Sequence, residues 1–251
     1  MEKLTLETCF IPSSFHRYNC NGAIVVVIDV LRASSAICTA FENGAEAIIP
    51  VSEVDEAMDY KKRGFLVAAE RDGYVLDFAD FGNSPFNFTP GRVKGKIIAY
   101  STTNGTRIIK MTSDSYKTVI GAFVNISSLT GWLTEFNKNV ILFCAGWKDR
   151  FSLEDAVCAG AFASRLLESG LFATICDSTL AAIDLWHLAE NNTFDYIEKA
   201  AQRSRLRDKG LDDCIDFCLT PDFTRIIPAV EKGRIIPLNP SLQLSNKGKK
   251  L

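Results

Sequence analysis

The chain has 251 residues, of which 47% are hydrophobic and 23% charged, and its formal net charge is -2. This composition is ordinary for a globular protein, and the length suits one large domain or two small lobes. The near-neutral charge gives no reason to expect nucleic acid or an anionic membrane surface as a partner. We also expect no membrane segment, because no apolar run approaches the roughly 20 residues that a membrane helix needs. Glu2 and Glu7 lie in an N-terminus without a long apolar core, so we expect no signal peptide.

Eight cysteines lie at positions 9, 20, 38, 144, 158, 176, 214 and 218. They form no Cys-x-x-Cys pair, and His16 and His187 are the only histidines, so we do not expect a zinc site. Most of the cysteines lie in apolar stretches, which predicts reduced thiols packed as small hydrophobic groups. Reduced cysteines indicate a reducing compartment, and we therefore predict a cytoplasmic protein.

In chain order, three apolar runs each lead into a polar segment and then into a helical pattern. The runs are long enough for buried strands and occupy 23–28, 96–101 and 140–146. We name the polar segments the first junction (29–35), the second junction (101–105) and the third junction (150–155).

The remaining elements alternate between strand and helix patterns. After the first junction we predict a helix at 36–43, a strand at 46–51, a helix at 54–64 and a strand at 66–73. The stretch 77–90 contains FGNSP and is long for a structureless connection, which favours a functional loop. After the second junction come a helix at 106–111, a strand at 117–125 and a helix at 126–136. After the third junction we predict helices at 153–169 and 178–201, a strand pair within 222–237 and a polar basic tail at 238–251.

This alternation predicts an α/β layered fold in which helices flank a mixed, largely parallel sheet. We expect a single domain over 1–237, although two lobes are compatible with the pattern, followed by the tail. In α/β sheets, ligands bind at the carboxyl ends of the strands. The three junctions therefore predict one shared site for a charged small molecule.

The first junction offers a carboxylate at the end of a buried strand. An ionised Asp29 there is costly unless it meets a metal, a cation or several donors. Arg32 could be a purely structural ion-pair partner. Alternatively, Asp29 is a magnesium ligand or phosphoryl acceptor, and Arg32 binds an anion. Ser34 and Ser35 follow at a predicted helix start, where free N–H groups favour anions.

The second junction is rich in hydroxyl and amide groups. Its residues are Ser101, Thr102, Thr103, Asn104 and Gly105. They form either a simple turn with a helix cap or a cradle for phosphate, sulfonate or carboxylate.

In the third junction, Arg150 offers a fork of donors for an oxyanion, and Ser152 precedes the helix. Glu154 and Asp155 are either partners of the helix dipole or metal ligands. Magnesium takes oxygen ligands and keeps several waters, so two or three carboxylates from separate segments suffice. Candidates are Asp29, Glu70, Glu154 and Asp155.

Two known phosphatase patterns fit these segments poorly. Cys144 and Arg150 have the spacing of a thiolate phosphatase loop, but Asp149 between them would repel phosphate and raise the pKa of the thiol. The haloacid dehalogenase pattern is absent, because no second aspartate follows two residues after Asp29.

Four segments in this order, IDVLRASS, AAERDG with FGNSP, STTNGT and AG…RFSLED, resemble the motifs of the 2-phosphosulfolactate phosphatase (ComB-like) family. The resemblance extends over nearly the whole chain and includes Gly210, Asp213 and Cys214. It implies a magnesium-dependent enzyme that hydrolyses 2-phospho-3-sulfolactate to sulfolactate and phosphate on the route to coenzyme M. The family's motif positions fall on Asp29, Arg32, Glu70, Asn83, Ser84, Thr103, Asn104, Gly105, Arg150, Glu154 and Asp155. The chain departs from the pattern at Trp147, Lys148 and Asp149, where we expect smaller or neutral residues, and this difference bears on substrate fit.

Taken together, the residues and the resemblance predict a cytoplasmic, Mg²⁺-dependent phosphatase of a small phosphorylated sulfonate. Asp29, Arg32 and Arg150 are the predicted catalytic residues. The predicted substrate-binding residues are Ser34, Ser35, Asn83, Ser84, Thr102, Thr103, Asn104, Gly105 and Ser152. Two alternatives stay open, a thiolate phosphatase that uses Cys144 and a non-catalytic module that binds sulfonates or organic anions. The sequence does not fix the oligomeric state, and a homo-oligomer is compatible with it.

Overall fold

The computed structural model describes residues 2–71, 73–102 and 105–238. Its strands are β1 (Leu4–Cys9), β2 (Ile24–Ile28), β3 (Ala47–Val51), β4 (Leu66–Arg71), β5 (Tyr74–Val75), β6 (Ile97–Ser101), β7 (Lys117–Gly121), β8 (Val140–Cys144), β9 (Phe172–Ala173), β10 (Ile227–Glu231) and β11 (Arg234–Leu238). Its α-helices are α1 (Ala33–Glu42), α2 (Val54–Lys62), α3 (Pro90–Val93), α4 (Gly105–Met111), α5 (Ile126–Glu135), α6 (Leu153–Glu168), α7 (Asp177–Ala189), α8 (Thr193–Ile197), α9 (Ala201–Arg207) and α10 (Ile215–Leu219). Short 3₁₀ helices are η1 (Pro12–Arg17), η2 (Pro85–Asn87) and η3 (Phe123–Asn125). The predicted tail lies outside the described residues, except for Leu238 at the end of β11.

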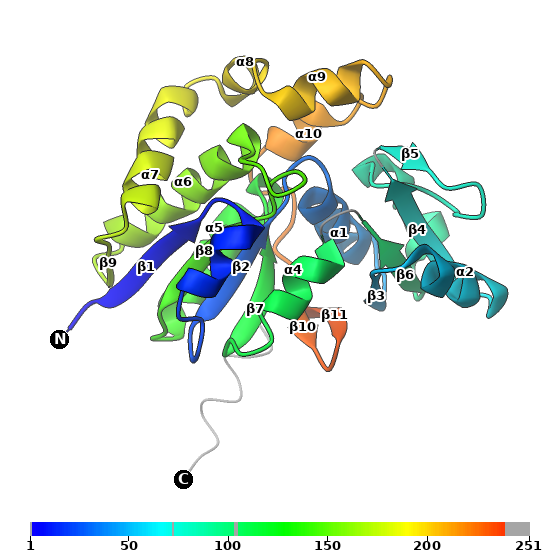
Figure 1. The fold of residues 1–251 in the computed structure, drawn as a ribbon, viewed down its shortest axis with the longest axis horizontal. Helices are drawn as coiled ribbons and strands as arrows, with labels where there is room; N and C mark the ends of the chain where they lie inside the picture. Colours follow the sequence, from blue (N-terminus) through cyan, green and yellow to red (C-terminus); the bar gives the residue numbers. More distant parts are fainter. Residues whose placement is uncertain (1, 72, 103–104, 239–251) are drawn as a thin grey trace, which may run out of the picture.

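Within the described residues the strands form one sheet in the order β5-β4-β6-β3-β11-β10-β7-β2-β8-β1-β9 (Figure 1). Strands β7, β2, β8, β1 and β9 pair in parallel, and we call them the first block. Strands β3, β6 and β4 also pair in parallel and form the second block. The C-terminal hairpin β10–β11 lies between the blocks and pairs antiparallel with both. The predicted α/β fold with a mixed, largely parallel sheet is therefore confirmed.

The twist of the sheet decides where the strand ends point. Three antiparallel pairings separate the blocks, β7–β10, β10–β11 and β11–β3, so the strand direction reverses between them. Twist accumulates at roughly 20–25° per pair, and the six pairings from β2 to β4 turn the direction by roughly 120–150°. This rotation largely offsets the reversal. The carboxyl ends of β2 and β4 consequently meet in one place.

Helix α1 packs against one face of the twisted sheet (Figure 1). Its Ala36, Ile37 and Phe41 share one apolar cluster with Val25 of the first block and Ile98 of the second. Both blocks therefore pack on the same helix, and the N-terminus of that helix lies where their strand ends converge.

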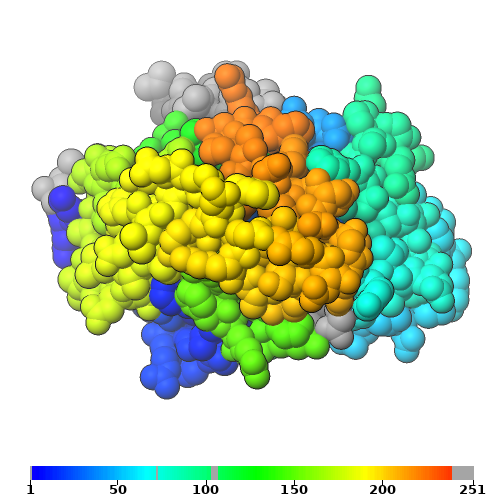
Figure 2. All heavy atoms as spheres, turned by 90° about the horizontal axis from the view of Figure 1, so that it is seen from above, coloured from blue at the N-terminus to red at the C-terminus, as the bar shows by residue number. Residues whose placement is uncertain are grey.

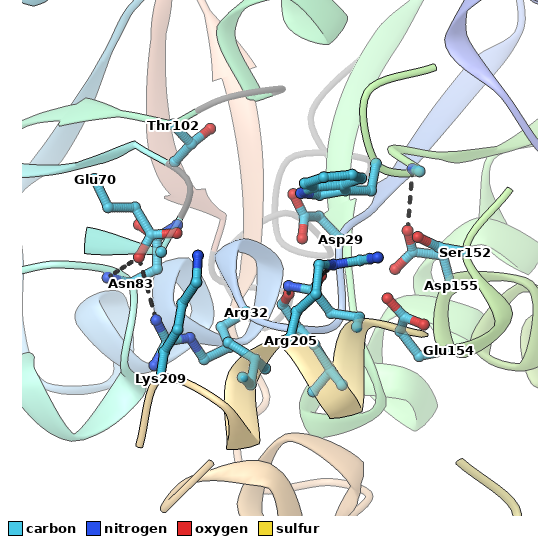
Figure 3. Close-up of a pocket in the computed structure, with 16 residues that line it drawn as sticks. Asp29, Arg32, Glu70, Asn83, Thr102, Ser152, Glu154, Asp155, Arg205 and Lys209 are labelled. Atoms are coloured by element: carbon cyan, nitrogen blue, oxygen red, sulfur yellow. Dashed lines mark hydrogen bonds and ion pairs between the residues drawn. The ribbon is translucent and has the colours of Figure 1, made fainter. Parts of the chain in front are cut away.

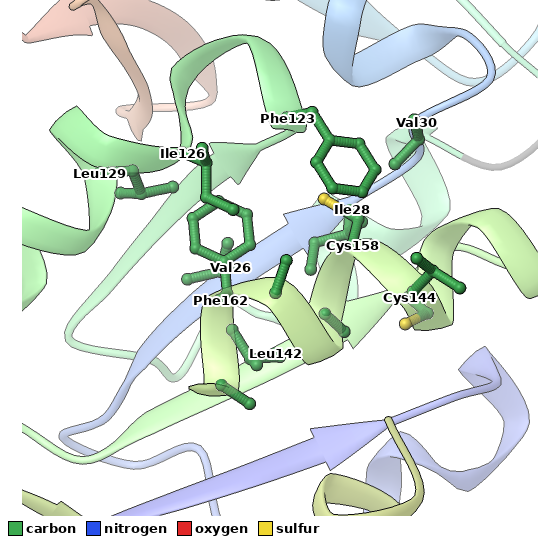
Figure 4. Close-up of a cluster of buried hydrophobic side chains, with 14 of the residues drawn as sticks. Val26, Ile28, Val30, Phe123, Ile126, Leu129, Leu142, Cys144, Cys158 and Phe162 are labelled. Atoms are coloured by element: carbon green, nitrogen blue, oxygen red, sulfur yellow. The ribbon is translucent and has the colours of Figure 1, made fainter. Parts of the chain in front are cut away.

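The opposite face of the first block is covered by α5 and α6. Residues Val26 and Ile28 of β2 pack there with Leu129 of α5 and Phe162 of α6 (Figure 4). Strand β2 is thus apolar on both faces, as its uninterrupted apolar run predicts. Each fully buried side chain of this kind contributes on the order of 1.5–3 kcal/mol to stability.

Two expectations about elements were incomplete. Strand β1 was not predicted, because its sequence contains no apolar run. One of its buried residues is the polar Thr8, whose hydroxyl accepts a hydrogen bond from Thr179 at 3.0 Å. The predicted helix at 178–201 is divided into α7 and α8, with α9 beginning only at Ala201. The division occurs at Asn192, whose side chain caps α8 by accepting the Asp195 N–H at 3.1 Å.

Close packing of α6 against α7 gives a first prediction. A Cβ on Gly160 would lie 1.9 Å from the carbonyl oxygen of Ala182, so Gly160→Ala should lower the free energy of unfolding by roughly 1–3 kcal/mol. Gly131 in α5 has open space around it, so Gly131→Ala should be neutral or stabilising by up to about 1 kcal/mol. Denaturant unfolding of both variants tests this. Equal effects would show that α6 and α7 do not pack this closely.

Candidate active site

A cleft opens at the N-terminus of α1, between the two blocks of the sheet, and holds about 650 Å³ with its open mouth included. Helix α9, from the C-terminal part of the chain, borders it through Gln202, Arg205 and Leu206. Its acidic side chains are Asp29, Glu70, Glu154 and Asp155, and its basic ones are Arg32, Arg205 and Lys209 (Figure 3). The sequence analysis named all four carboxylates as candidate metal ligands. The structure brings the separate segments that carry them to one cleft.

Arg32 connects the parts that surround this cleft. Its side chain is 3% exposed, and Nη2 lies 3.2 Å from Oε2 of Glu70 on β4. Nη1 donates to the carbonyl oxygen of Leu211, also at 3.2 Å. The same Glu70 oxygen accepts the backbone N–H of Asn83 at 3.2 Å. Arg32 is therefore both a member of the cleft and the link between β2, β4 and the segment after α9.

The serines of the first junction are used within the turn. The Asp29 N–H donates to Oγ of Ser34 at 2.9 Å, and the Ser34 N–H donates back to the Asp29 carbonyl at 2.8 Å. The Ser35 hydroxyl donates to the Val30 carbonyl at 3.0 Å. Both serines are buried and neither lines the cleft. Their predicted contact with substrate finds no support in this geometry, and they shape the turn that presents Asp29.

Asp155 joins the first and third junctions. Its Oδ1 accepts the Val30 N–H at 2.9 Å, and its Oδ2 accepts the Gly146 N–H at 3.1 Å. Each carboxylate oxygen is thus held by a backbone donor of a different strand-end loop. Glu154 and Ser152 lie beside it, and both are buried side chains that line the cleft.

The second junction is only partly described. Ser101 is buried, and its hydroxyl accepts a hydrogen bond from Arg71 at 2.9 Å. Thr102, a predicted substrate-binding residue, lines the cleft. Thr103 and Asn104 lie outside the described residues, and Gly105 is the first residue of α4.

The loop predicted at 77–90 contributes Asn83 to the cleft. The side-chain oxygen Oδ1 of Asn83 is buried and has no hydrogen-bond partner among the residues that the structure describes. An unsatisfied buried acceptor costs about 1–3 kcal/mol, so this atom points to a donor that a ligand or a water supplies. Ser84 does not line the cleft and lies next to the thiol of Cys214.

Arg150 is not brought to this cleft. Its side chain is exposed and borders a neighbouring depression, while its backbone pairs with Trp147 through two hydrogen bonds of 3.0 Å. The sequence reasoning missed two other basic residues of the cleft, Arg205 on α9 and Lys209 just after it. In the sequence these two residues are separated by four positions. Basic residues at this spacing usually lie on a solvent-exposed helix face, so the spacing alone did not indicate a site.

The carboxylates of the cleft repel one another in a buried environment. The pKa of Asp29 is raised to about 7, chiefly by burial and next by the negative charge of Glu154. The hydrogen bond from the Ala33 N–H and the charge of Arg32 act in the opposite direction. Burial also raises the pKa of Glu70, Glu154 and Asp155. The cleft therefore favours uptake of a proton or a cation.

The four carboxylates do not form one compact cage. Across residues 2–71, 73–102 and 105–238, no three Asp, Glu, His or Cys side chains are close enough to hold a metal ion as a group. Glu70 forms an ion pair with Arg32, and Asp155 accepts hydrogen bonds from two backbone N–H groups. The negative charges of Asp29 and Glu154, by contrast, repel each other.

Cys144 has no access to the cleft. It is fully buried in the apolar cluster under α6, and burial raises its thiol pKa well above the ordinary value (Figure 4). A neutral, inaccessible thiol is a poor nucleophile, so this position argues against the thiolate mechanism. All eight cysteines are free, as predicted.

Comparisons with known proteins agree with these observations. A family model described as 2-phosphosulpholactate phosphatase matches residues 9–233. The chain belongs to this family. It is 38% identical to a protein of Caldanaerobacter subterraneus subsp. tengcongensis, over 83% of this chain and 88% of the relative. It is 36% identical to a protein of Thermotoga maritima, over 84% and 90%. Both relatives are named "Probable 2-phosphosulfolactate phosphatase".

This member of the 2-phosphosulpholactate phosphatase family has, among its described residues, no helix that is both long and apolar enough to span a bilayer.

The raised pKa of Asp29 predicts a pH dependence of stability. An unfolded aspartate titrates near about 4, so between about pH 4 and pH 7 the folded protein binds more protons than the unfolded chain. The stabilisation linked to Asp29 is therefore present at low pH and lost as pH rises to about 7. Relative to wild type, Asp29→Asn should gain stability between about pH 5 and pH 7. Thermal melts in EDTA measure this, and a constant difference would contradict the raised pKa.

Proposed function

We propose that this protein is a cytoplasmic, Mg²⁺-dependent phosphatase that hydrolyses 2-phosphosulfolactate to sulfolactate and phosphate. The observation that carries the proposal is the cleft itself, which combines the half-buried Asp29 and the buried Glu154 with the cations Arg32, Arg205 and Lys209. The names of the relatives support the substrate. Eight free cysteines support a reducing compartment, and the route to coenzyme M is part of the same proposal.

The residues of the cleft fit a magnesium ion, with Asp29 and Glu154 as the carboxylates that would hold it. Magnesium is commonly bound by one or two carboxylates together with waters and phosphate oxygens, so a compact cage of three acidic side chains is not required. The repulsion by Glu154 that raises the pKa of Asp29 is one that a bound cation would relieve. When bound, the ion would neutralise the charge of the phosphoryl oxygens.

The protein's own groups supply the rest of the chemistry. Arg32 lies within the cleft beside Glu70 and places a fixed positive charge near the phosphoryl group. Asp29 is presented by a turn that Ser34 closes through the Asp29 backbone, which fixes the main chain from which the carboxylate projects. It is placed to accept either the phosphoryl group or a proton from the attacking water. Phosphopeptide mass spectrometry after acid quenching separates these routes, because only the first leaves phosphate on Asp29.

Phosphate release from 2-phosphosulfolactate tests the function. Wild type should release phosphate with Mg²⁺ and stop in excess EDTA, and Cys144→Ser should keep wild-type turnover. Asp29→Asn should lower kcat roughly 100-fold or more, because it removes a charge that the reaction requires. Melting temperatures of each variant serve as the folding control.

Other outcomes select the alternatives. Release that survives EDTA and disappears in Cys144→Ser would establish the thiolate mechanism. Binding of sulfolactate without release of phosphate from the ester would establish the binding module.

A further inference from the structure

One face of α9 and the residues just after it is turned into the cleft. Gln202, Arg205 and Leu206 are spaced by three and four residues, which places them on one side of α9, and Lys209 follows the helix; all four line the cleft. Seen from above, the segment from α8 to α10, yellow to orange, crosses the molecule toward β4 and β5 (Figure 2). The cleft is thus bordered by a segment far in sequence from the three junctions.

This segment is firmly attached. Gln202 Nε2 donates to the Leu31 carbonyl at 3.1 Å, and Leu206 is buried in the apolar cluster of the first block. On the other side of α9, Arg203 is buried and forms ion pairs of 3.0 Å with Glu198 and 2.8 Å with Asp212. The position of Arg205 is therefore fixed by contacts that do not involve its own charge.

Arg205 is oriented but not neutralised by an ion pair. Its guanidinium lies over the Trp147 ring, 4.1 Å from the centroid, and its Nε donates to Gln202 at 2.8 Å. Within the described residues its two Nη groups make no hydrogen bond and it forms no salt bridge, although Glu154 interacts with it electrostatically. Arg32, by comparison, already uses both Nη groups on Glu70 and Leu211.

We propose that Arg205, held against Trp147, binds an acidic group of the substrate that is not transferred, the sulfonate or the carboxylate, and thereby selects esters that carry one. The proposal rests on the proposed function. A phosphoryl group at Asp29 and Glu154 leaves the remaining acidic groups near α9. A planar guanidinium with two unused Nη groups matches either oxyanion. Trp147 is a positioning residue that keeps the guanidinium directed into the cleft.

The test compares four esters, which are 2-phosphosulfolactate, O-phospholactate without the sulfonate, the phosphate ester of isethionate without the carboxylate, and ethyl phosphate with neither. Arg205→Gln should lower kcat/KM for 2-phosphosulfolactate roughly 10- to 100-fold, mainly through KM, and should affect ethyl phosphate far less. If Arg205 binds the sulfonate, kcat/KM for the isethionate ester should fall as much as for 2-phosphosulfolactate. If Arg205 binds the carboxylate, kcat/KM for O-phospholactate should fall as much instead. Trp147→Leu should show the same selectivity with a smaller loss. An equal loss on all four esters would overturn the proposal.

Arg207→Gln is the matched control, because Arg207 lies on the same helix, is exposed and pairs with Glu198. It should change no ester selectively. Calorimetric titration with sulfolactate separates this proposal from the phosphatase itself. If wild type hydrolyses none of the esters, the proposed function fails, but weaker sulfolactate binding by Arg205→Gln than by Arg207→Gln would still support the anion site. Equal binding by the two variants would overturn it.

Discussion

The cleft depends on the interactions of one buried group, the guanidinium of Arg32. It reaches Glu70 on β4 and the Leu211 carbonyl after α9, and it comes from the turn that also presents Asp29. A buried charge of this kind is strongly destabilising when its partner is removed, because the remaining charge is uncompensated. Residues separated by up to 179 positions in the sequence thus meet at one side chain. The structure therefore couples the shape of the cleft to the packing of its C-terminal border.

The arrangement of the sheet makes this meeting possible. A flat sheet with the observed pairings would put the carboxyl ends of β2 and β4 on opposite edges. The accumulated twist brings them together, and the shared packing of both blocks on α1 keeps them there. Asp155 adds a second connection, between the loops after β2 and β8, through backbone hydrogen bonds. The polar groups of the cleft are consequently held by the main framework of the fold.

Much of this could be predicted from local sequence, and the rest required knowledge of packing. The uninterrupted apolar run at Ile24–Ile28 announces a strand buried on both faces, and the acidic residues that converge on the cleft follow such runs or a helix start. Strand β1 has no such signal, because Thr8 is buried in a hydrogen bond with Thr179. Arg150 and Arg205 cannot be ranked from sequence, because only the fold shows that Arg205 stacks on Trp147 inside the cleft while Arg150 is exposed.

The central position of the hairpin β10–β11 has a consequence for biosynthesis. These strands join the first block to the second, yet in the described part of the chain they are the last to be synthesised. During translation, the two blocks can assemble their own parallel pairs, but backbone hydrogen bonds join them into one sheet only after Ile227–Leu238 has left the ribosome. The edges of β7 and β3 stay unpaired until then, and such edges are exposed to wrong association. Completion of the cleft thus depends on strands that follow every other described element in the chain.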